Sequence, residues 1–155
     1  MFKQTMLFSF ILGITAIGSA QKMGKEVQFK VRIENVSKGE ILKAMNGGTA
    51  PAAIAPVLYI VHTIDAPLYK TGQKDWGRGL ENLAEDGNPT KQAEFCKHNK
   101  GVASSGVMNI PVGETSPGPA KPGMAYELSF TASKGQRFTT AEMFGQSNDL
   151  FYAPS

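Results

Sequence analysis

The sequence predicts an all-β protein, an antiparallel β-sandwich with a short helical crossover between strands. Three observations support this fold class. Residues 27–36 and 125–132 alternate between apolar and polar side chains, which is typical of half-buried strands. Residues 57–64 are apolar on both faces and rich in β-branched side chains, as in a central strand. Helical periodicity is confined to residues 76–97, so we expect packed sheets with the functional loops at one end.

The first two predicted strands differ in how they should be covered. Residues 27–36 would turn one apolar face toward a core and one charged face toward solvent, whereas residues 57–64 should be covered on both sides. His62 lies inside the second of these strands. We interpret it as a hydrogen-bonded core residue, because no second His or Cys stands at metal-ligand spacing. The apolar positions of the first strand are Val27, Phe29, Val31 and Ile33.

The segments around the central strand predict loops and two short helices. Residues 39–56 are rich in Gly, Ala and Pro and predict a loop with one helical turn around residues 41–45. Residues 76–84 bring apolar side chains onto one side, which predicts a short amphipathic helix weakened by two internal glycines. A turn sequence then leads into a second, polar helix over residues 90–97.

The C-terminal third returns to the strand pattern. Residues 107–110 predict a short strand, and residues 125–132 and 137–144 predict two longer ones. Residues 133–135, Ser-Lys-Gly, form a short connection that contains glycine. The sequence therefore predicts that the two longer strands pair as a hairpin.

Residues 1–20 have the organisation of a signal peptide. Lys3 precedes an apolar run over residues 6–17, and small residues end at Ala20, so we expect cleavage before Gln21 and a polar lead-in over residues 21–26. The apolar run is shorter than the roughly 20 residues that span a bilayer, and no longer run follows, so we expect no membrane span. A retained N-terminal anchor is the alternative. The sequence thus predicts a secreted, periplasmic or cell-surface protein.

Composition limits the number of domains and the kinds of partner. A chain of 155 residues with 41% hydrophobic residues can bury one sizeable core, so we expect a single domain over residues 27–155. The formal net charge is +3, but Lys and Arg are scattered singly among acidic residues, which argues against a nucleic-acid partner. Cys96 is the only cysteine, so the exported chain cannot form an internal disulfide.

A polar stretch near the C-terminus is the strongest candidate for a binding loop. Residues 144–152 place four oxygen-bearing side chains in succession, followed by apolar residues that would fix the loop to the core. Calcium takes about 6 to 8 oxygen ligands in irregular geometry, so such a loop suits it. The alternative is an ordinary turn, since Asn, Asp and Ser favour turns. The four side chains belong to Gln146, Ser147, Asn148 and Asp149.

Catalytic motifs are incomplete in this sequence. Residues 145–149 match a nucleophile elbow at three positions only, because Asp149 replaces the final glycine. A secreted hydrolase that uses Ser147 with His62 or His98 as its base is therefore the alternative, and a protein without enzymatic activity is the expectation. Three carboxylates lie close together in the predicted helix and after it, but their spacing does not establish the facing pair that a glycosidase needs. They belong to Glu81, Glu85 and Asp86.

Five short motifs stand in a particular order along the chain: Pro56-Val-Leu-Tyr-Ile-Val-His62, Pro67-Leu-Tyr69 with Gly72, Gly79-Leu-Glu-Asn-Leu-Ala-Glu-Asp-Gly87, Pro117-Gly-Pro119 with Pro122-Gly123, and Met143-Phe-Gly-Gln-Ser-Asn-Asp149. This order resembles the spondin domain, especially its bacterial branch, and the likeness covers residues 27–155. Animal relatives are extracellular-matrix and adhesion modules. The resemblance implies a secreted binding module for a protein or glycan, with a C2-like β-sandwich and a calcium site in the loops at one end.

The resemblance also implies that part of the family's pattern is missing. The family continues past the Ser-x-Asp run to an Asp-Ala-Gly-Thr-Asp/Glu segment, whereas this chain stops at Ser155, so we expect a domain that is incomplete at its C-terminus. Of the family's calcium ligands only Asp149 has an equivalent here, with oxygens of Asn148 and Gln146 as helpers. One carboxylate and a few neutral oxygens predict weak calcium binding, with a Kd of ~10⁻³ M or worse.

Overall fold

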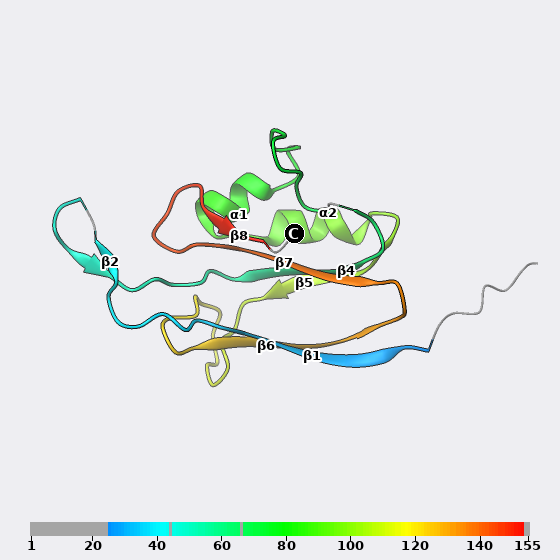
Figure 1. Ribbon diagram of the computed structural model, residues 1–155, viewed down its shortest axis with the longest axis horizontal. Coiled ribbons are helices and arrows are strands. Elements are labelled where there is room, and N and C mark those ends of the chain that lie inside the picture. The colour runs from blue at the N-terminus through cyan, green and yellow to red at the C-terminus, as the bar shows by residue number, and fades with distance from the viewer. Residues whose placement is uncertain (1–24, 44, 66, 154–155) are drawn as a thin grey trace, which may run out of the picture.

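The computed structural model describes residues 25–43, 45–65 and 67–153, and these form two packed β-sheets with helices on one outer face (Figure 1). The predicted all-β sandwich with a helical crossover is confirmed. The predicted signal peptide, the first four residues of the lead-in and the last two residues of the predicted domain lie outside the described residues. The strands are β1 (Val27–Glu34), β2 (Leu42–Lys43), β3 (Thr49–Ala50), β4 (Val57–His62), β5 (Val102–Met108), β6 (Ala125–Ala132), β7 (Arg137–Met143) and β8 (Phe151–Tyr152), and the helices are α1 (Leu80–Asp86) and α2 (Thr90–Lys97).

Strand β4 is the centre of the larger sheet, as its apolar sequence predicts. That sheet has the order β5-β4-β7-β8, and β4 pairs antiparallel with both of its neighbours. Five of its six residues are buried. A strand covered on both faces needs apolar, β-branched side chains on both faces, which explains why residues 57–64 show no alternation.

The helical crossover covers one face of the larger sheet (Figure 1). Leu83 of α1 and Cys96 of α2 are fully buried against Leu58 and Ile60 of β4 and Ala141 of β7. The second predicted helix, residues 90–97, is confirmed with the same bounds.

The first predicted helix is shorter than the apolar pattern suggests. The interpretation of residues 76–84 as one helix was wrong at its start, because Gly77 and Gly79 have φ values of 68° and 108°, outside the helical region. Gly79 also lies against α2, where an added Cβ would come within 2.7 Å of the Gln92 backbone nitrogen. The helix therefore begins only at Leu80.

A second apolar core fills the space between the two sheets. Tyr126 of β6 and Val57 of β4 are fully buried there, and Met108 and Ala120 pack against them. The rings of Phe130 and Phe138 stack across the gap, with centroids 4.6 Å apart. The odd residues of β1 face the same gap, yet Val27 and Phe29 remain 49% and 45% exposed, so the predicted buried face of this strand is covered only toward its C-terminal end.

The predicted hairpin over residues 125–144 is wrong. Strand β6 pairs with β1, whereas β7 pairs with β4 and β8, so the 133–136 connection carries the chain from one sheet to the other. The connection is closed by hydrogen bonds between residues 133 and 136, including Ser133 N to Gln136 Oε1 at 2.7 Å. The two strands instead face each other across the gap, where Phe130 and Phe138 stack.

Two further predictions are corrected. Where a helical turn was expected around residues 41–45, the described residues form the β2–β3 hairpin. Its turn contains Asn46, which accepts a 3.1 Å hydrogen bond from Gly48 N, and Gly47 with a φ of 81°, a combination that favours tight hairpins. The strand predicted at residues 107–110 overlaps the end of β5, which runs from Val102 to Met108. Pairing with β4 holds the preceding Ser-rich segment in the strand despite its low strand propensity.

Candidate functional site

The loop over residues 144–150 joins β7 to β8, and its backbone is closed at both ends. Phe144 N donates to Leu150 O at 2.9 Å, and Gly145 N donates to Ala53 O at 2.8 Å. A Cβ on Gly145 would lie 2.6 Å from that Ala53 oxygen, so this close approach requires glycine. Phe151 and Tyr152 form β8 and pair with β7. Of the three apolar residues expected to fix the loop, Phe151 packs against the core, whereas Leu150 and Tyr152 are exposed.

Ser147 is the internal brace of this loop. Its hydroxyl donates to Phe144 O at 2.6 Å and accepts from Leu150 N at 3.3 Å. Gln146, just before it, has a φ of 72°, a conformation that non-glycine residues seldom adopt. The Ser147 side chain therefore ties together the two ends of a strained turn, a structural role for this candidate binding residue.

Asp149 reaches an acidic depression that lies between the loop and α1. Lys74, Glu81, Glu85 and Asp149 contribute to its wall, and the volume is about 590 Å³. Desolvation by neighbouring groups raises the pKa of the exposed Glu85, and the charges of Glu81, Asp149 and Asp86 raise it further. This electrostatic coupling places the Asp149 carboxylate near α1, although the two segments are far apart in the sequence.

The donor chemistry of the depression fits a hard cation, but the number of donors limits its affinity. Asp149 and Glu85 supply carboxylate oxygens, which calcium prefers. Gln146 and Asn148, the predicted helpers, are exposed and do not line the depression. Among the described residues no three His, Cys, Asp or Glu side chains converge as a metal-binding group. The depression is therefore acidic, with Asp75, Glu81, Glu85 and Asp149 in its wall, but its carboxylates do not converge on one point.

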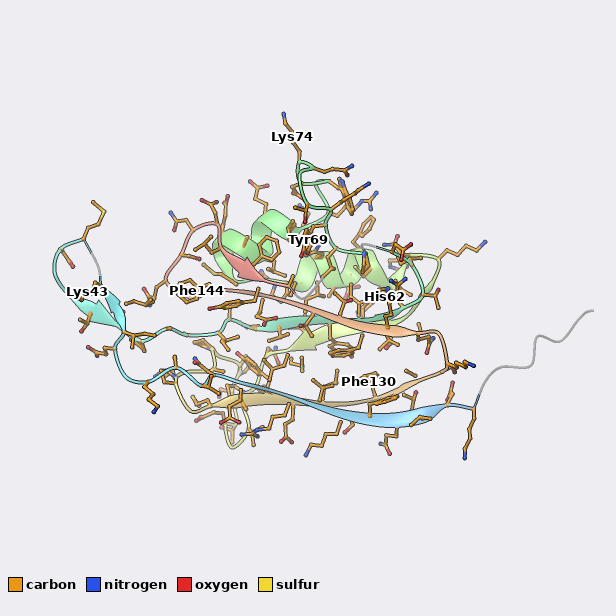
Figure 2. All side chains as sticks on the ribbon, in the orientation of Figure 1. Lys43, His62, Tyr69, Lys74, Phe130 and Phe144 are labelled. Carbon is orange, nitrogen blue, oxygen red and sulfur yellow. The ribbon has the colours of Figure 1, made fainter. Side chains whose placement is uncertain are left out.

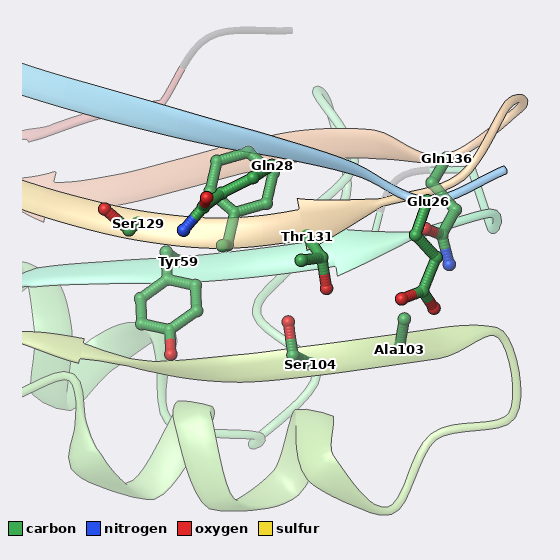
Figure 3. A pocket seen from close by; sticks show the side chains of 9 residues that line it. Glu26, Gln28, Tyr59, Ala103, Ser104, Ser129, Thr131 and Gln136 are labelled. Carbon is green, nitrogen blue, oxygen red and sulfur yellow. The ribbon is translucent and has the colours of Figure 1, made fainter.

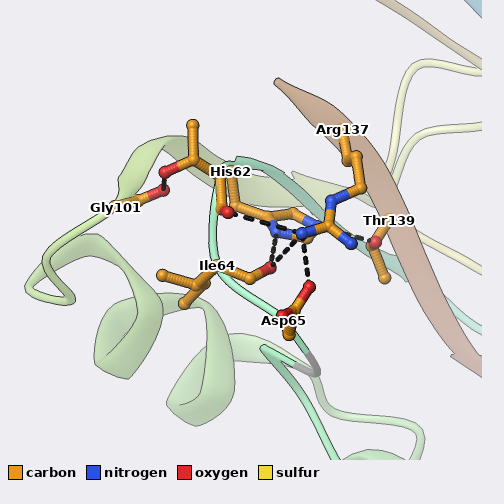
Figure 4. A network of polar contacts seen from close by, with 7 residues as sticks. His62, Ile64, Asp65, Gly101, Arg137 and Thr139 are labelled. Atoms are coloured by element: carbon orange, nitrogen blue, oxygen red, sulfur yellow. Dashed lines mark hydrogen bonds and ion pairs between the residues drawn. The ribbon is translucent and has the colours of Figure 1, made fainter. Parts of the chain in front are cut away.

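His62 belongs to a structural network at the opposite end of β7 (Figure 4). The residue is buried, and its ring nitrogens bond Ile64 O at 2.7 Å and Thr139 Oγ1 at 2.8 Å, which confirms the prediction of a hydrogen-bonded core histidine. The Arg137 guanidinium closes the network from outside by donating to Asp65 Oδ1 at 2.6 Å. This network anchors the chain where it leaves β4.

The histidines and Ser147 do not form a catalytic set. His62 and Phe144, the first residue of the Ser147 loop, lie at opposite ends of the larger sheet (Figure 2). His98 caps the C-terminus of α2 and is exposed. Cys96 is fully buried, and burial raises the pKa of its thiol to about 11. The thiol is thus protonated at neutral pH and is a poor nucleophile.

A polar groove follows the seam where the edge strands β5 and β6 approach each other (Figure 3). Its volume is about 480 Å³. The Tyr59 ring lies over Gly106 of β5, where an added Cβ would come within 2.8 Å of the tyrosine oxygen. Hydroxyl, amide and carboxylate groups line the groove, a set that can exchange hydrogen bonds with polyhydroxylated ligands. They belong to Glu26, Gln28, Tyr59, Ser104, Ser129, Thr131 and Gln136.

Two groupings of acidic residues in the structure were not predicted from the sequence. Glu81 and Glu85 meet Asp149 only because α1 packs over the end of β7, and a sequence pattern carries no signal for that contact. Glu142 is a buried acid inside β7. A signal for it existed, because Glu142 occupies an inward position in the alternation that also contains Phe138 and Phe144.

Comparison with protein-family models, with curated proteins and with solved structures finds no match to this chain. The likeness to the spondin domain therefore rests on the motifs of the sequence. Among the described residues, no helix has the length and apolar character needed to cross a membrane.

Proposed function

We propose that this protein is a non-enzymatic binding module of the spondin type, secreted or held at the cell envelope, which binds an extracellular protein or glycan. We further propose that it takes a calcium ion weakly beneath the 144–150 loop. The observation that carries the proposal is the loop itself, braced internally by Ser147 and tied to Ala53, which presents Asp149 over the acidic depression.

Rigidity is what makes this loop suitable for binding. A loop that is already held in one conformation loses little conformational entropy when a ligand or ion docks, so more of the contact energy appears as affinity. Desolvation is the main cause of the raised pKa of Glu85, and repulsion from Glu81 and Asp149 adds to it; calcium between Asp149 and Glu85 would offset that repulsion. No three of the described carboxylates converge as a metal-binding group, so we expect a weak site with a Kd of ~10⁻³ M, in the range of extracellular calcium modules.

The polar groove favours a glycan among the ligands of such a module. Its hydroxyl and amide groups match the hydrogen-bonding capacity of a sugar, and the Tyr59 ring adds an aromatic edge. Its wall contains one carboxylate, Glu26, whereas most glycosidases use a pair of carboxylates across the scissile bond. The groove is therefore suited to holding a sugar without cleaving it.

A glycan array tests this proposal directly. The purified protein should retain a sugar, and a Thr131→Val and Ser104→Ala double variant, which removes two hydroxyls from the groove, should lose it. Repeating the array with calcium and with a chelator separates the two sites, because the groove and the depression share no lining residue. Retention that is the same in the double variant would refute the glycan assignment.

The competing function, a hydrolase that uses Ser147, makes a different prediction. An activated serine reacts with a fluorophosphonate probe, whereas a hydroxyl that braces a loop and lacks a histidine partner does not. We expect the purified protein to remain unlabelled. Labelling that disappears in Ser147→Ala but leaves the protein folded would replace the binding module with a hydrolase.

Export is a separate part of the proposal. The leader over residues 1–20 should be removed, so the mass of the mature protein should correspond to a chain that begins at Gln21. Mass spectrometry of protein recovered from the medium and the cell envelope measures this. Recovery of an envelope protein that retains Met1 would instead favour an N-terminal anchor.

A further inference from the structure

Glu142 is a buried acid whose charge is not balanced by the part of the chain that the structure describes. The residue is only 6% exposed, and its Oε2 atom has no hydrogen-bond partner among the described residues. Burial raises the pKa of Glu142 from 4.5 to about 7. An unpaired buried carboxylate is costly, so a group of this kind calls for a compensating partner.

Glu142 contributes to the wall of an open pocket of about 540 Å³ between the two sheets. In β7, Ala141 faces the helices, so Glu142 faces the inter-sheet side. Tyr152 lies directly opposite Glu142 in the register of β8, and apolar groups form most of the remaining wall. A second carboxylate, Glu34, stands in the wall contributed by β1. The other lining residues are Ile33, Ile54, Phe151 and Ala153.

We propose that this pocket binds an organic cation, a guanidinium or ammonium group carried on an apolar chain, with Glu142 as its counter-ion. The apolar wall would cover the chain, Glu142 would accept hydrogen bonds from the cationic head, and Tyr152 would add an aromatic ring. The ligand is either a free small cation or an arginine or lysine side chain of a partner protein. This site shares only Phe151 with the acidic depression and does not depend on calcium.

The groups around Glu142 favour a cation over an anion or a neutral ligand. Glu34 adds negative charge at the pocket, although Arg32 donates to it at 3.2 Å. Tyr126 of β6 also lies close enough for its pKa to be raised by Glu142, but its hydroxyl already donates to Gly118 O at 2.6 Å. Tyr152 is the third titratable group that faces the carboxyl. A cation would therefore meet one unpartnered acid and a second one held by Arg32.

Binding should depend on pH in a direction that the carboxyl sets. The ligand binds the ionised form of Glu142, so affinity should rise as pH increases through about 7. Butylguanidinium is the probe of choice, because a guanidinium stays charged throughout this range. Between about pH 6 and pH 8 the ionised fraction of a group with this pKa rises about tenfold, so the affinity measured by calorimetry should rise about tenfold.

Three controls make the measurement specific. Butylurea has nearly the same shape without the charge and should not bind measurably. Glu142→Gln keeps the shape of the side chain and should weaken butylguanidinium binding by at least about tenfold, the usual scale for loss of a charged partner. Glu34→Gln, the matched control at the wall of the pocket, should weaken binding less than Glu142→Gln does.

A short peptide with one internal arginine identifies the source of the cation. Tighter binding of the peptide than of butylguanidinium indicates a protein side chain, and weaker binding indicates a free small cation. The proposal is overturned if butylguanidinium does not bind, if butylurea binds equally well, or if Glu142→Gln binds as the wild type does. Should Glu142→Gln fail to fold, the pH dependence of the wild-type protein decides: equal affinity at about pH 6 and pH 8 refutes the proposal.

Discussion

Replacing Glu142 by glutamine should stabilise the protein at alkaline pH and remove part of its pH dependence. In the wild-type protein the folded-state pKa of about 7 lies above the ordinary value of 4.5, because burial disfavours the charged form. Between these values the folded protein binds more protons than the unfolded chain. The free energy of unfolding therefore falls as pH rises from about 4.5 to about 7, and it is highest at the acidic end of this window.

The size of the effect follows from the pKa difference. The rise of the Glu142 pKa from 4.5 to about 7 corresponds to about 3 kcal/mol of stability. Glutamine cannot ionise, so Glu142→Gln lacks this term. We compare the stability of the variant with that of the wild type at each pH. From about pH 4.5 to about pH 8 this difference should shift in favour of the variant by up to about 3 kcal/mol.

Urea unfolding of both proteins at about pH 4.5 and pH 8 measures this double difference. Titration of the other carboxylates is common to the two proteins, so it cancels in this double difference. This cancellation is needed because Lys30 and Arg32 lower the pKa of Glu127, which makes the free energy of unfolding rise with pH rather than fall. A wild-type protein that loses no more stability with rising pH than Glu142→Gln would refute the view that the carboxyl is buried without a partner.

Two further predictions concern the 144–150 loop. Ser147→Ala removes both hydrogen bonds of the Ser147 hydroxyl and should lower the free energy of unfolding by about 1 kcal/mol. Ser147→Thr keeps the hydroxyl and should lose less stability. Equal losses in urea unfolding would contradict the bracing role of Ser147. Gly145→Ala places a Cβ 2.6 Å from Ala53 O and should lower the free energy of unfolding by about 1–3 kcal/mol. The control Gly118→Ala places its Cβ with no atom within 4 Å and should be close to neutral. A Gly145→Ala variant as stable as the wild type would contradict the close approach of Gly145 to Ala53.

Local sequence patterns predicted individual elements well. Strand β6 and helix α2 have the expected bounds, because alternation and turn chemistry are local properties of those segments. Strand β4 was recognised as central because it is apolar on both faces. The periodicity of a strand, however, does not say which strand it pairs with. Strands β6 and β7 were therefore predicted correctly as strands, but the prediction that they pair with each other was wrong.

The candidate site was predictable only in part, for a similar reason. The run of polar residues identified the 144–150 loop, but the Ser147 hydroxyl points into the turn and the oxygens of Gln146 and Asn148 do not line the depression. The carboxylates that do accompany Asp149 are those of Asp75 and of Glu81 and Glu85 in α1, far away in the sequence. Side-chain direction and long-range packing decide such a site, and neither can be inferred from a local sequence pattern.

Thermal melting with and without calcium tests the central claim, that Asp149 holds a calcium ion beneath the loop. With a Kd of ~10⁻³ M, calcium at about 10 mM should stabilise the folded state by about 1.4 kcal/mol and raise Tm by about 4 °C over a control of equal ionic strength. The increment should vanish in Asp149→Ala, shrink in Glu85→Gln and persist in Glu114→Gln, which changes an exposed carboxylate that does not line the depression. A wild-type Tm unchanged by calcium, or an increment that survives Asp149→Ala, would contradict the account.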